Sequence, residues 1–340
     1  MSHEFLQVAW YLLVGVLMTG YAILDGFDLG VGVLSPFIAR SDKERRLLLN
    51  AVGPFWDGNE VWLLTGGGAL FAAFSHVYAT VFSGFYLALM LVLFALILRA
   101  VSFEFRSKVE SQTWRQAWDW VFFGSSLLPA LLTGVAVGNV MRGVPLDAQM
   151  EFAGNFFMLL NPFSLLVGLA GLAMFVTHGA IYLMVKTDGA VAERAERGAI
   201  VGWIAWVILA LLVTVVAVFD APARFEGKPL VVWALPVLTV IFLALTRVNV
   251  GRGEAGNAFL FSALSIAGLM AVFGAANFPY LLPARNVVEN GLTLYNASAS
   301  QKTLTAMFII ALIGMPLVIT YTAYIYYIFR GKTKVEKGGY

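Results

Sequence analysis

Residues 8–37 read VAWYLLVGVLMTGYAILDGFDLGVGVLSPF, a run whose only charged side chains are those of Asp25 and Asp28. A helix needs about 20 apolar residues to cross the hydrocarbon core of a bilayer, so this run is long enough to span one. The rest of the 340-residue chain has the same character, because it is 60% hydrophobic and only 12% charged. Its mean hydropathy is +0.82, and a soluble domain is about 25% charged. The composition therefore predicts an all-α, polytopic membrane protein.

The scarcity of metal-ligating side chains limits the chemistry that this chain can perform alone. Cysteine is absent, which excludes disulfides, iron–sulfur clusters and thiolate ligands. Only three histidines occur, and the net charge of +2 gives no support for binding nucleic acid. The segment Met1–Gln7 has no Lys or Arg, so we expect no removable signal peptide. We expect no metal site in this chain and no redox chemistry without a partner.

Nine apolar runs are long enough to predict transmembrane helices. They cover residues 8–37, 50–74, 78–99, 119–141, 160–185, 199–219, 229–247, 258–280 and 304–329. No long soluble segment interrupts them, so we expect a single integral membrane domain over residues 1–340. A weak division is also expected, into helix bundles at 1–142 and 155–282 and a last helix at 303–330.

The positions of the basic residues predict the orientation of these helices. Of the 22 Lys and Arg residues, all but five fall after the first, third, fifth and seventh runs or in the C-terminal tail. In this count Arg99 belongs to the connection after the third run, and Lys337 belongs to the tail. The five on the other side are Arg142, Arg224, Lys228, Arg285 and Lys302. Since cytoplasmic connections carry the excess of positive charge, we expect the N-terminus outside and the C-terminus in the cytoplasm.

Two pairs of carboxylates fall within the first two runs. Asp25 and Asp28 are three residues apart, as are Asp57 and Glu60, so each pair shares one helix face. At 1.5 Å per residue, all four lie roughly 10–20 Å from the cytoplasmic ends of their helices. A carboxylate facing lipid costs several kcal/mol, so these groups must face protein, water or one another. We favour a proton or ion path along them, with Asp57 as the first candidate. The alternative is a structural role, as helix caps or as hydrogen-bonding links between the two helices.

Three aromatic side chains in the predicted helices have two interpretations. His178, in the stretch FVTHGA at residues 175–180, could ligate haem if it is buried. A packing role, with a hydrogen bond to a backbone carbonyl, is the favoured interpretation. Trp56 and Trp62 flank the second carboxylate pair, and packing is the default for both.

Two further acids, Glu104 and Asp119, flank the third connection on the predicted cytoplasmic side. We expect them to form interfacial salt bridges. The candidate partners are Arg106, Lys108 and Arg115.

Several short motifs follow one another along nearly the whole chain. They are LDGFDLGVG (24–32), GPFWDGNEVWLLT (53–65), GGGALFAAF (66–74), FSGFY (82–86), WDW (118–120), GNFF (154–157), NPF (161–163) and NAS (296–298). In these motifs and their order the chain resembles subunit II of the cytochrome bd-type quinol oxidases. That subunit is the non-haem partner of a haem-bearing subunit I.

The resemblance implies a heterodimer in the bacterial inner membrane that oxidises quinol and reduces O2 to water. It implies haem b and haem d in subunit I, and a proton gradient that is built without pumping. The matching aspartate, Asp57, would line a proton route from the cytoplasm, and the helix near Trp62 would line an oxygen channel. The resemblance also allows a structural quinone in this chain and a small single-helix third subunit.

Two other classes of function fit the residues without the resemblance. A proton-coupled secondary transporter would also hold buried acids in interrupted helices. No matching pair of interrupted helices is evident in the two halves of the sequence. The other class is a purely structural assembly partner, in which all four acids serve only packing.

Overall fold

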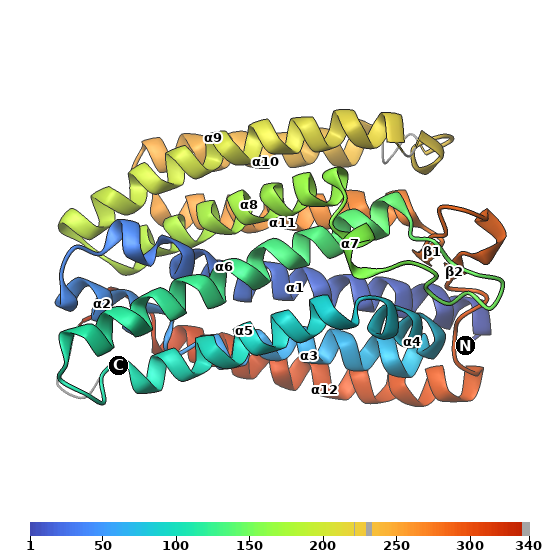
Figure 1. The fold of residues 1–340 in the computed structure, drawn as a ribbon, viewed down its shortest axis with the longest axis horizontal. Coiled ribbons are helices and arrows are strands. Elements are labelled where there is room, and N and C mark those ends of the chain that lie inside the picture. The colour runs from blue at the N-terminus through green and yellow to red at the C-terminus, as the bar shows by residue number, and fades with distance from the viewer. Residues whose placement is uncertain (221, 229–232, 335–340) are drawn as a thin grey trace.

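The computed structural model is a bundle of long, nearly parallel helices with short connections at both ends (Figure 1). It describes residues 1–220, 222–228 and 233–334. The start of the predicted run 229–247, and Lys337, lie outside these residues. The helices are α1 (His3–Ile38), α2 (Asp42–Val52), α3 (Trp56–Ala73), α4 (Ser75–Gly84), α5 (Tyr86–Phe105), α6 (Gln112–Arg142), α7 (Phe156–Leu159), α8 (Pro162–Lys186), α9 (Gly189–Asp220), η1 (Pro222–Arg224), α10 (Leu235–Gly251), α11 (Ala255–Asn277), η3 (Val288–Asn290) and α12 (Gln301–Ile328), and the strands are β1 (Tyr280–Leu282) and β2 (Leu292–Thr293).

Seven helices within the described residues are long and apolar enough to cross a membrane: α1, α5, α6, α8, α9, α11 and α12. This confirms an all-α, multi-pass membrane protein. Each of the nine predicted runs overlaps a helix, but two of these helices fall short of a spanning helix. The helix α10 is apolar but has only 17 residues. The helix α3 has 18 residues and carries Asp57, Asn59 and Glu60 in its first two turns.

Two boundaries differ from the predicted runs. The run 78–99 is divided at Phe85 between the short α4 and the longer α5, which continues to Phe105. Arg99, predicted in a connection, therefore lies inside α5, where it is fully buried. The run 50–74 begins inside α2, which ends just before Gly53-Pro54. Pro54 has no backbone N–H to continue the helical hydrogen bonds, so α2 stops there and α3 starts anew.

Close contact between α1 and α8 sets the centre of the bundle. A Cβ atom placed on Gly30 would lie 1.9 Å from the carbonyl oxygen of Phe175, and one on Gly179 would lie 2.6 Å from the Gly30 backbone. Only glycine permits two helix backbones to approach so closely. Phe27 and Ile181, both 0% exposed, belong to the packed core beside this crossing.

Serine and asparagine side chains mark where most of the long helices begin. Ser2, Ser41, Ser111, Asn161 and Ser300 each accept a hydrogen bond from the backbone N–H three residues later. These are N-caps, which satisfy one of the free donors at a helix start.

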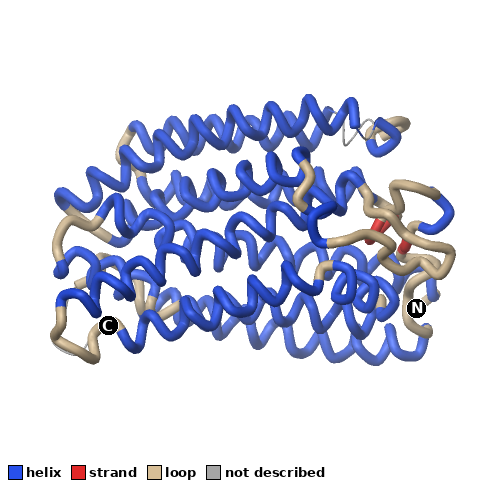
Figure 2. Tube along the Cα trace, in the orientation of Figure 1, coloured by secondary structure: helices blue, strands red, loops and turns tan. Residues whose placement is uncertain are grey.

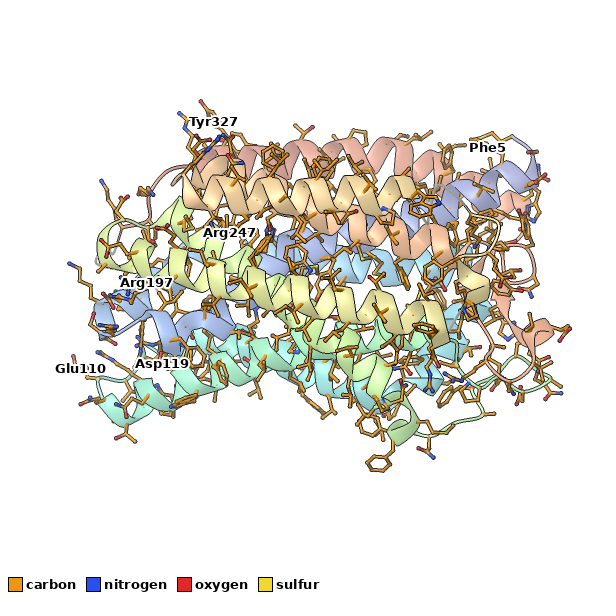
Figure 3. The ribbon with its side chains drawn as sticks, turned by 90° about the horizontal axis from the view of Figure 1, so that it is seen from above. Phe5, Glu110, Asp119, Arg197, Arg247 and Tyr327 are labelled. Atoms are coloured by element: carbon orange, nitrogen blue, oxygen red, sulfur yellow. The ribbon has the colours of Figure 1, made fainter. Side chains whose placement is uncertain are left out.

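The two ends of the bundle are different in character. One end carries the two-stranded β1–β2 ribbon, drawn in red in Figure 2, beside the start of α1. The other end gathers charged residues: Glu110, Asp119 and Arg197 lie there in Figure 3, far from Phe5. The connections predicted to be rich in basic residues thus lie at one end of the fold, and the sparsely basic ones lie at the other.

The α1–α8 contact can be tested with two matched substitutions on one helix. We expect Gly30→Ala to lower the free energy of unfolding by about 1–3 kcal/mol, because the new methyl group overlaps the Phe175 carbonyl. The control is Gly15→Ala, since no atom lies within 4 Å of a Cβ placed there. Thermal unfolding in detergent would measure both. Equal melting temperatures for Gly30→Ala and Gly15→Ala would contradict the close contact.

Candidate functional site

A buried cluster of charges lies between α1 and α5. Arg99 of α5 donates from Nη2 to Oδ1 of Asp25 at 2.6 Å, and the same nitrogen is 3.8 Å from Oδ2 of Asp28. Both carboxylates come from α1, and none of the three residues is more than 1% exposed. Removing a charge from water is costly unless it is paired, and here the two acids have one cation, Arg99, beside them. We call Asp25, Asp28 and Arg99 the buried charge cluster.

Two further helices hold one side of this cluster. Asn59 of α3 donates from Nδ2 to Oδ2 of Asp28 at 2.7 Å and to the carbonyl oxygen of Leu24 at 3.1 Å. Tyr326 of α12 donates its hydroxyl hydrogen to Oδ1 of Asn59, over 3.0 Å. Hydrogen bonds thus connect α12, through α3, to the acidic face of α1.

The other two predicted acids lie farther out on α3. Glu60 is half-buried and interacts electrostatically with Arg99, Asp25 and Asp57. Asp57 is exposed on this chain. The structure therefore brings Asp25, Asp28 and Glu60 together and leaves Asp57 beside them at the surface.

Three residues of this site are absent from the predicted set. The sequence pattern puts Arg99 in a connection, because Arg at the end of an apolar run commonly marks the membrane boundary. Asn59 and Tyr326 are neutral, and nothing in their local pattern separates them from other polar residues of their helices. The apolar residues after Arg99 (Ala100, Val101 and Phe103) are the signal that the helix continues.

The two predicted tryptophans pack against neighbouring helices. The ring of Trp56 stacks on that of Phe103 with centroids 5.2 Å apart. The ring of Trp62 lies over Gly20 of α1, where an added Cβ would be 2.2 Å from a ring carbon. Both are half-buried. Packing is therefore their visible role, and a role in an oxygen channel stays a prediction.

His178 is a fully buried packing residue. Its Nε2 lies 3.1 Å from the carbonyl oxygen of Ile23, and its Nδ1 lies 2.9 Å from the hydroxyl of Ser262. Its ring also stacks on Phe259, with centroids 4.5 Å apart. Both ring nitrogens are engaged, so the geometry does not fit an axial haem ligand. Within the described residues, no three or more His, Cys, Asp or Glu side chains are placed to hold a metal ion.

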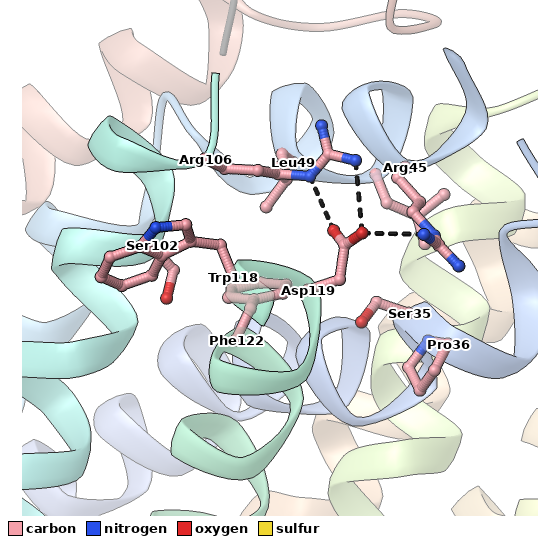
Figure 4. A pocket seen from close by; sticks show the side chains of 10 residues that line it. Ser35, Pro36, Arg45, Leu49, Ser102, Arg106, Trp118, Asp119 and Phe122 are labelled. Atoms are coloured by element: carbon pink, nitrogen blue, oxygen red, sulfur yellow. Dashed lines mark hydrogen bonds and ion pairs between the residues drawn. The ribbon is translucent and has the colours of Figure 1, made fainter. Parts of the chain in front are cut away.

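A second charged network ties the connections at the far end from β1 and β2. Figure 4 shows Asp119 between Arg106 and Arg45, at 2.6 Å and 2.8 Å. Arg106 also pairs with Asp42 at 2.8 Å, so the predicted salt bridge of Asp119 with Arg106 is confirmed. Glu104 forms no salt bridge within the part of the chain that the structure describes, so that expectation is wrong. The cavity beside this network is about 10 Å³, which is room for at most one water molecule.

The electrostatics of this network favour the ionised form of Asp42. Partial burial of the carboxylate opposes its charge. The hydrogen bond from Arg106 and the positive charges of Arg106, Arg115 and Arg46 outweigh that effect and lower the pKa of Asp42 below its ordinary 3.8. The pKa of Glu44 is lowered too: partial burial opposes its charge, and hydrogen bonds from the Arg40 backbone and from Arg194 outweigh it. Because these pKa values are depressed, the two ionised carboxylates stabilise the folded protein at neutral pH. This contribution disappears only in strong acid.

The fold of this chain is also found among solved structures. The bd oxidase from Geobacillus thermodenitrificans contains a chain with the same fold, at a TM-score of 0.81 and 19% sequence identity. The likeness covers 96% of this chain and 98% of that one.

Comparison of sequences shows which family the chain belongs to. The chain is 40% identical to the cytochrome bd-I ubiquinol oxidase subunit 2 of Escherichia coli strain K12, over 98% of this chain and 97% of that protein. It is 37% identical to the cytochrome bd ubiquinol oxidase subunit 2 of Bacillus subtilis strain 168, over 94% and 95%. The model of the family described as cytochrome bd terminal oxidase subunit II matches residues 6–329. The chain therefore belongs to this family, which confirms the resemblance seen in its motifs.

The cost of breaking the buried charge cluster can be compared with that of breaking a surface pair. We expect Arg99→Met to destabilise the protein by about 3–5 kcal/mol, because it leaves the buried Asp25 without its cation. The matched control is Arg115→Met, which removes a pair with Asp42 in which both side chains are about one-third exposed or more. We expect the control to cost less than about 1 kcal/mol. Thermal unfolding in detergent measures both, and equal effects would show that the buried pair contributes no more than the surface one.

Proposed function

We propose that this chain is the haem-free subunit of a complex that oxidises quinol and reduces O2 to water. The observation that carries this proposal is the family match over nearly the whole chain, residues 6–329. Relatives at 40% and 37% identity are named as subunits of ubiquinol oxidases. The partner is a haem-bearing subunit I that holds haem b and haem d and performs the electron transfer. The engaged nitrogens of His178 support leaving the haems to that partner.

The proposal includes nine membrane crossings, with the N-terminus outside and the C-terminus in the cytoplasm of a bacterial inner membrane. In this count, helices α3 and α10 cross the membrane in addition to the seven longer helices. At 1.5 Å per residue, their 18 and 17 residues cover about 25 Å, close to the thickness of the hydrocarbon core. An odd number of crossings agrees with the first and last helices, since α1 starts at one end of the bundle and α12 finishes at the other (Figure 1).

Subunit I, in this proposal, covers the outer face of α3. Asp57, Val61, Leu64 and Gly68 follow a helical repeat, so they share that face, and all four are exposed on this chain. A carboxylate on a lipid-facing surface costs several kcal/mol, so protein or water must lie against Asp57. No atom lies within 4 Å of a Cβ placed on Gly68. That open space permits another helix to approach closely.

In this arrangement the acids carry protons toward the partner. Asp57, at the interface, takes up a proton from the cytoplasmic side. Glu60, Asp25 and Asp28 lie next along α3 and α1 and form a polar path in an otherwise apolar core. The resemblance also makes the helix near Trp62 the candidate wall of an oxygen channel, with Trp56 on the same helix as a further candidate. A structural quinone and a small single-helix third subunit belong to the same proposal, as components of the purified complex.

Purification from native membranes tests the assignment as an oxidase subunit. We expect a tagged chain, extracted in mild detergent, to bring with it a second membrane protein and a reduced-minus-oxidised spectrum with b-type and d-type haem bands. Mass spectrometry would identify the partner and any small third subunit or bound quinone. A colourless chain that purifies alone, with its helices intact, would contradict the proposal.

Neutralising Asp57 tests the proton path. We expect Asp57→Asn to slow quinol oxidation roughly tenfold, which corresponds to about 1.4 kcal/mol in the barrier of the slow step. The membrane potential generated in liposomes should fall with it. Glu104→Gln is the control, because it neutralises an exposed acid on α5 without touching the path. An Asp57→Asn complex with full oxidation rate and full membrane potential would exclude Asp57 from the path.

A further inference from the structure

The buried charge cluster contains more acid than base. Two carboxyl groups, those of Asp25 and Asp28, share one guanidinium, that of Arg99, and each of the three residues is at most 1% exposed. If all three were ionised, the cluster would carry an uncompensated negative charge inside the bundle. An unpaired charge in such an environment is far more costly than a neutral, hydrogen-bonded acid.

The hydrogen bonds distinguish the two acids. Asp25 has the short contact with Arg99, at 2.6 Å, whereas the nearest oxygen of Asp28 is 3.8 Å from the same nitrogen. Asp28 receives instead a hydrogen bond from the neutral amide of Asn59, at 2.7 Å. Asp25 and Arg99 therefore form the ion pair, whereas Asp28 faces the neutral amide of Asn59.

The orientation of the Asn59 amide is fixed from both sides. Its nitrogen faces the carbonyl oxygen of Leu24, which can only accept, and its oxygen accepts from the hydroxyl of Tyr326. The amide nitrogen must therefore donate to Asp28, and Oδ2 of Asp28 must accept. The other oxygen, Oδ1, is buried and has no hydrogen-bond partner among the described residues.

We propose that Oδ1 of Asp28 holds a proton, next to a permanent ion pair of Asp25 with Arg99. Asn59 and Tyr326 are positioning residues, since they keep Oδ2 as an acceptor and leave Oδ1 as the only place for the proton. The cluster is then electrically neutral. The use of this proton during turnover rests on the proton path proposed above, whereas its presence at Asp28 does not.

The surroundings provide a route to exchange this proton. Nε and Nη1 of Arg99 are also buried without hydrogen-bond partners among the described residues, and the hydroxyl of Tyr21 faces Asp25. Buried polar atoms in such numbers are ordinarily satisfied by internal water. The other titratable groups that face the cluster are Glu60 on α3, Tyr182 on α8 and Tyr326 on α12. Among these, Glu60 is the acid through which water can bring a proton from the surface.

Infrared spectroscopy of the purified complex tests this assignment. The carboxyl carbons of aspartate are isotopically labelled, and difference spectra are recorded between ordinary and heavy water at neutral pH. We expect a protonated carboxyl band that shifts with the label and is lost in Asp28→Asn. The matched control is Asp188→Asn, at a side chain that is 73% exposed, and it should leave the band unchanged.

Two further variants test the charge balance. In Asp25→Asn, Asp28 is the remaining fully buried acid beside Arg99, so Asp28 ionises and the band is lost. In the double variant Arg99→Met with Asp25→Asn, the ion pair is removed as a unit, so Asp28 stays protonated and the band remains. A band that persists in Asp28→Asn would overturn the proposal. The absence of any aspartate-dependent band in the unsubstituted complex would overturn it without a variant. The spectra need no turnover, so an inactive complex would count against the oxidase function and not against this proton.

Discussion

The constraint on which this structure depends is that charged groups inside a bilayer must be solvated by protein. Arg99 lies six residues before the end of α5, and its side chain is fully buried within the bundle. Asp25 of α1 pairs with its charge, Asn59 donates a hydrogen bond to Asp28, and Tyr326 donates one to Asn59. Four helices that are distant in sequence are thereby tied at one level of the bundle. Apolar packing alone discriminates poorly between helix pairs in a membrane, because lipid is as apolar as a leucine side chain. The polar contacts therefore specify which helices belong together.

Close backbone packing supplies the rigidity that these charges need. Gly30 lies two residues from Asp28, so the contact of α1 with α8 fixes the height and rotation of the acidic face. On the other side of α1, the ring of Trp62 fills the space over Gly20. An ion pair at 2.6 Å tolerates little relative motion of its helices. The glycines of α1 thus serve the polar cluster by allowing a tight fit around it.

Most of the architecture could be predicted from hydropathy, because every predicted run overlaps a helix in the structure. The acidic pairs could be predicted too, since carboxylates in apolar runs are conspicuous. Arg99 could not, because its meaning depends on where α5 ends, and local sequence sets helix ends only loosely. The break at Phe85 follows Gly84, but an isolated glycine is tolerated inside a helix, so it is only a weak signal for a helix end. The roles of Asn59 and Tyr326 depend on contacts across 31 and 267 residues of sequence, which no local pattern encodes.

The last helix is fastened mainly at its two ends. Near its start, the indole of Trp10 donates to the carbonyl oxygen of Leu304. Beyond its end, Lys332 donates to the carbonyl oxygens of Met184 and Thr187, and Lys186 donates to that of Phe329. Only 6% of its most apolar stretch is buried within this chain. Sequence drift along the middle of α12 consequently costs this chain's own fold very little. That surface is free to coevolve with whatever lies against it, while the anchored ends keep the bundle unchanged.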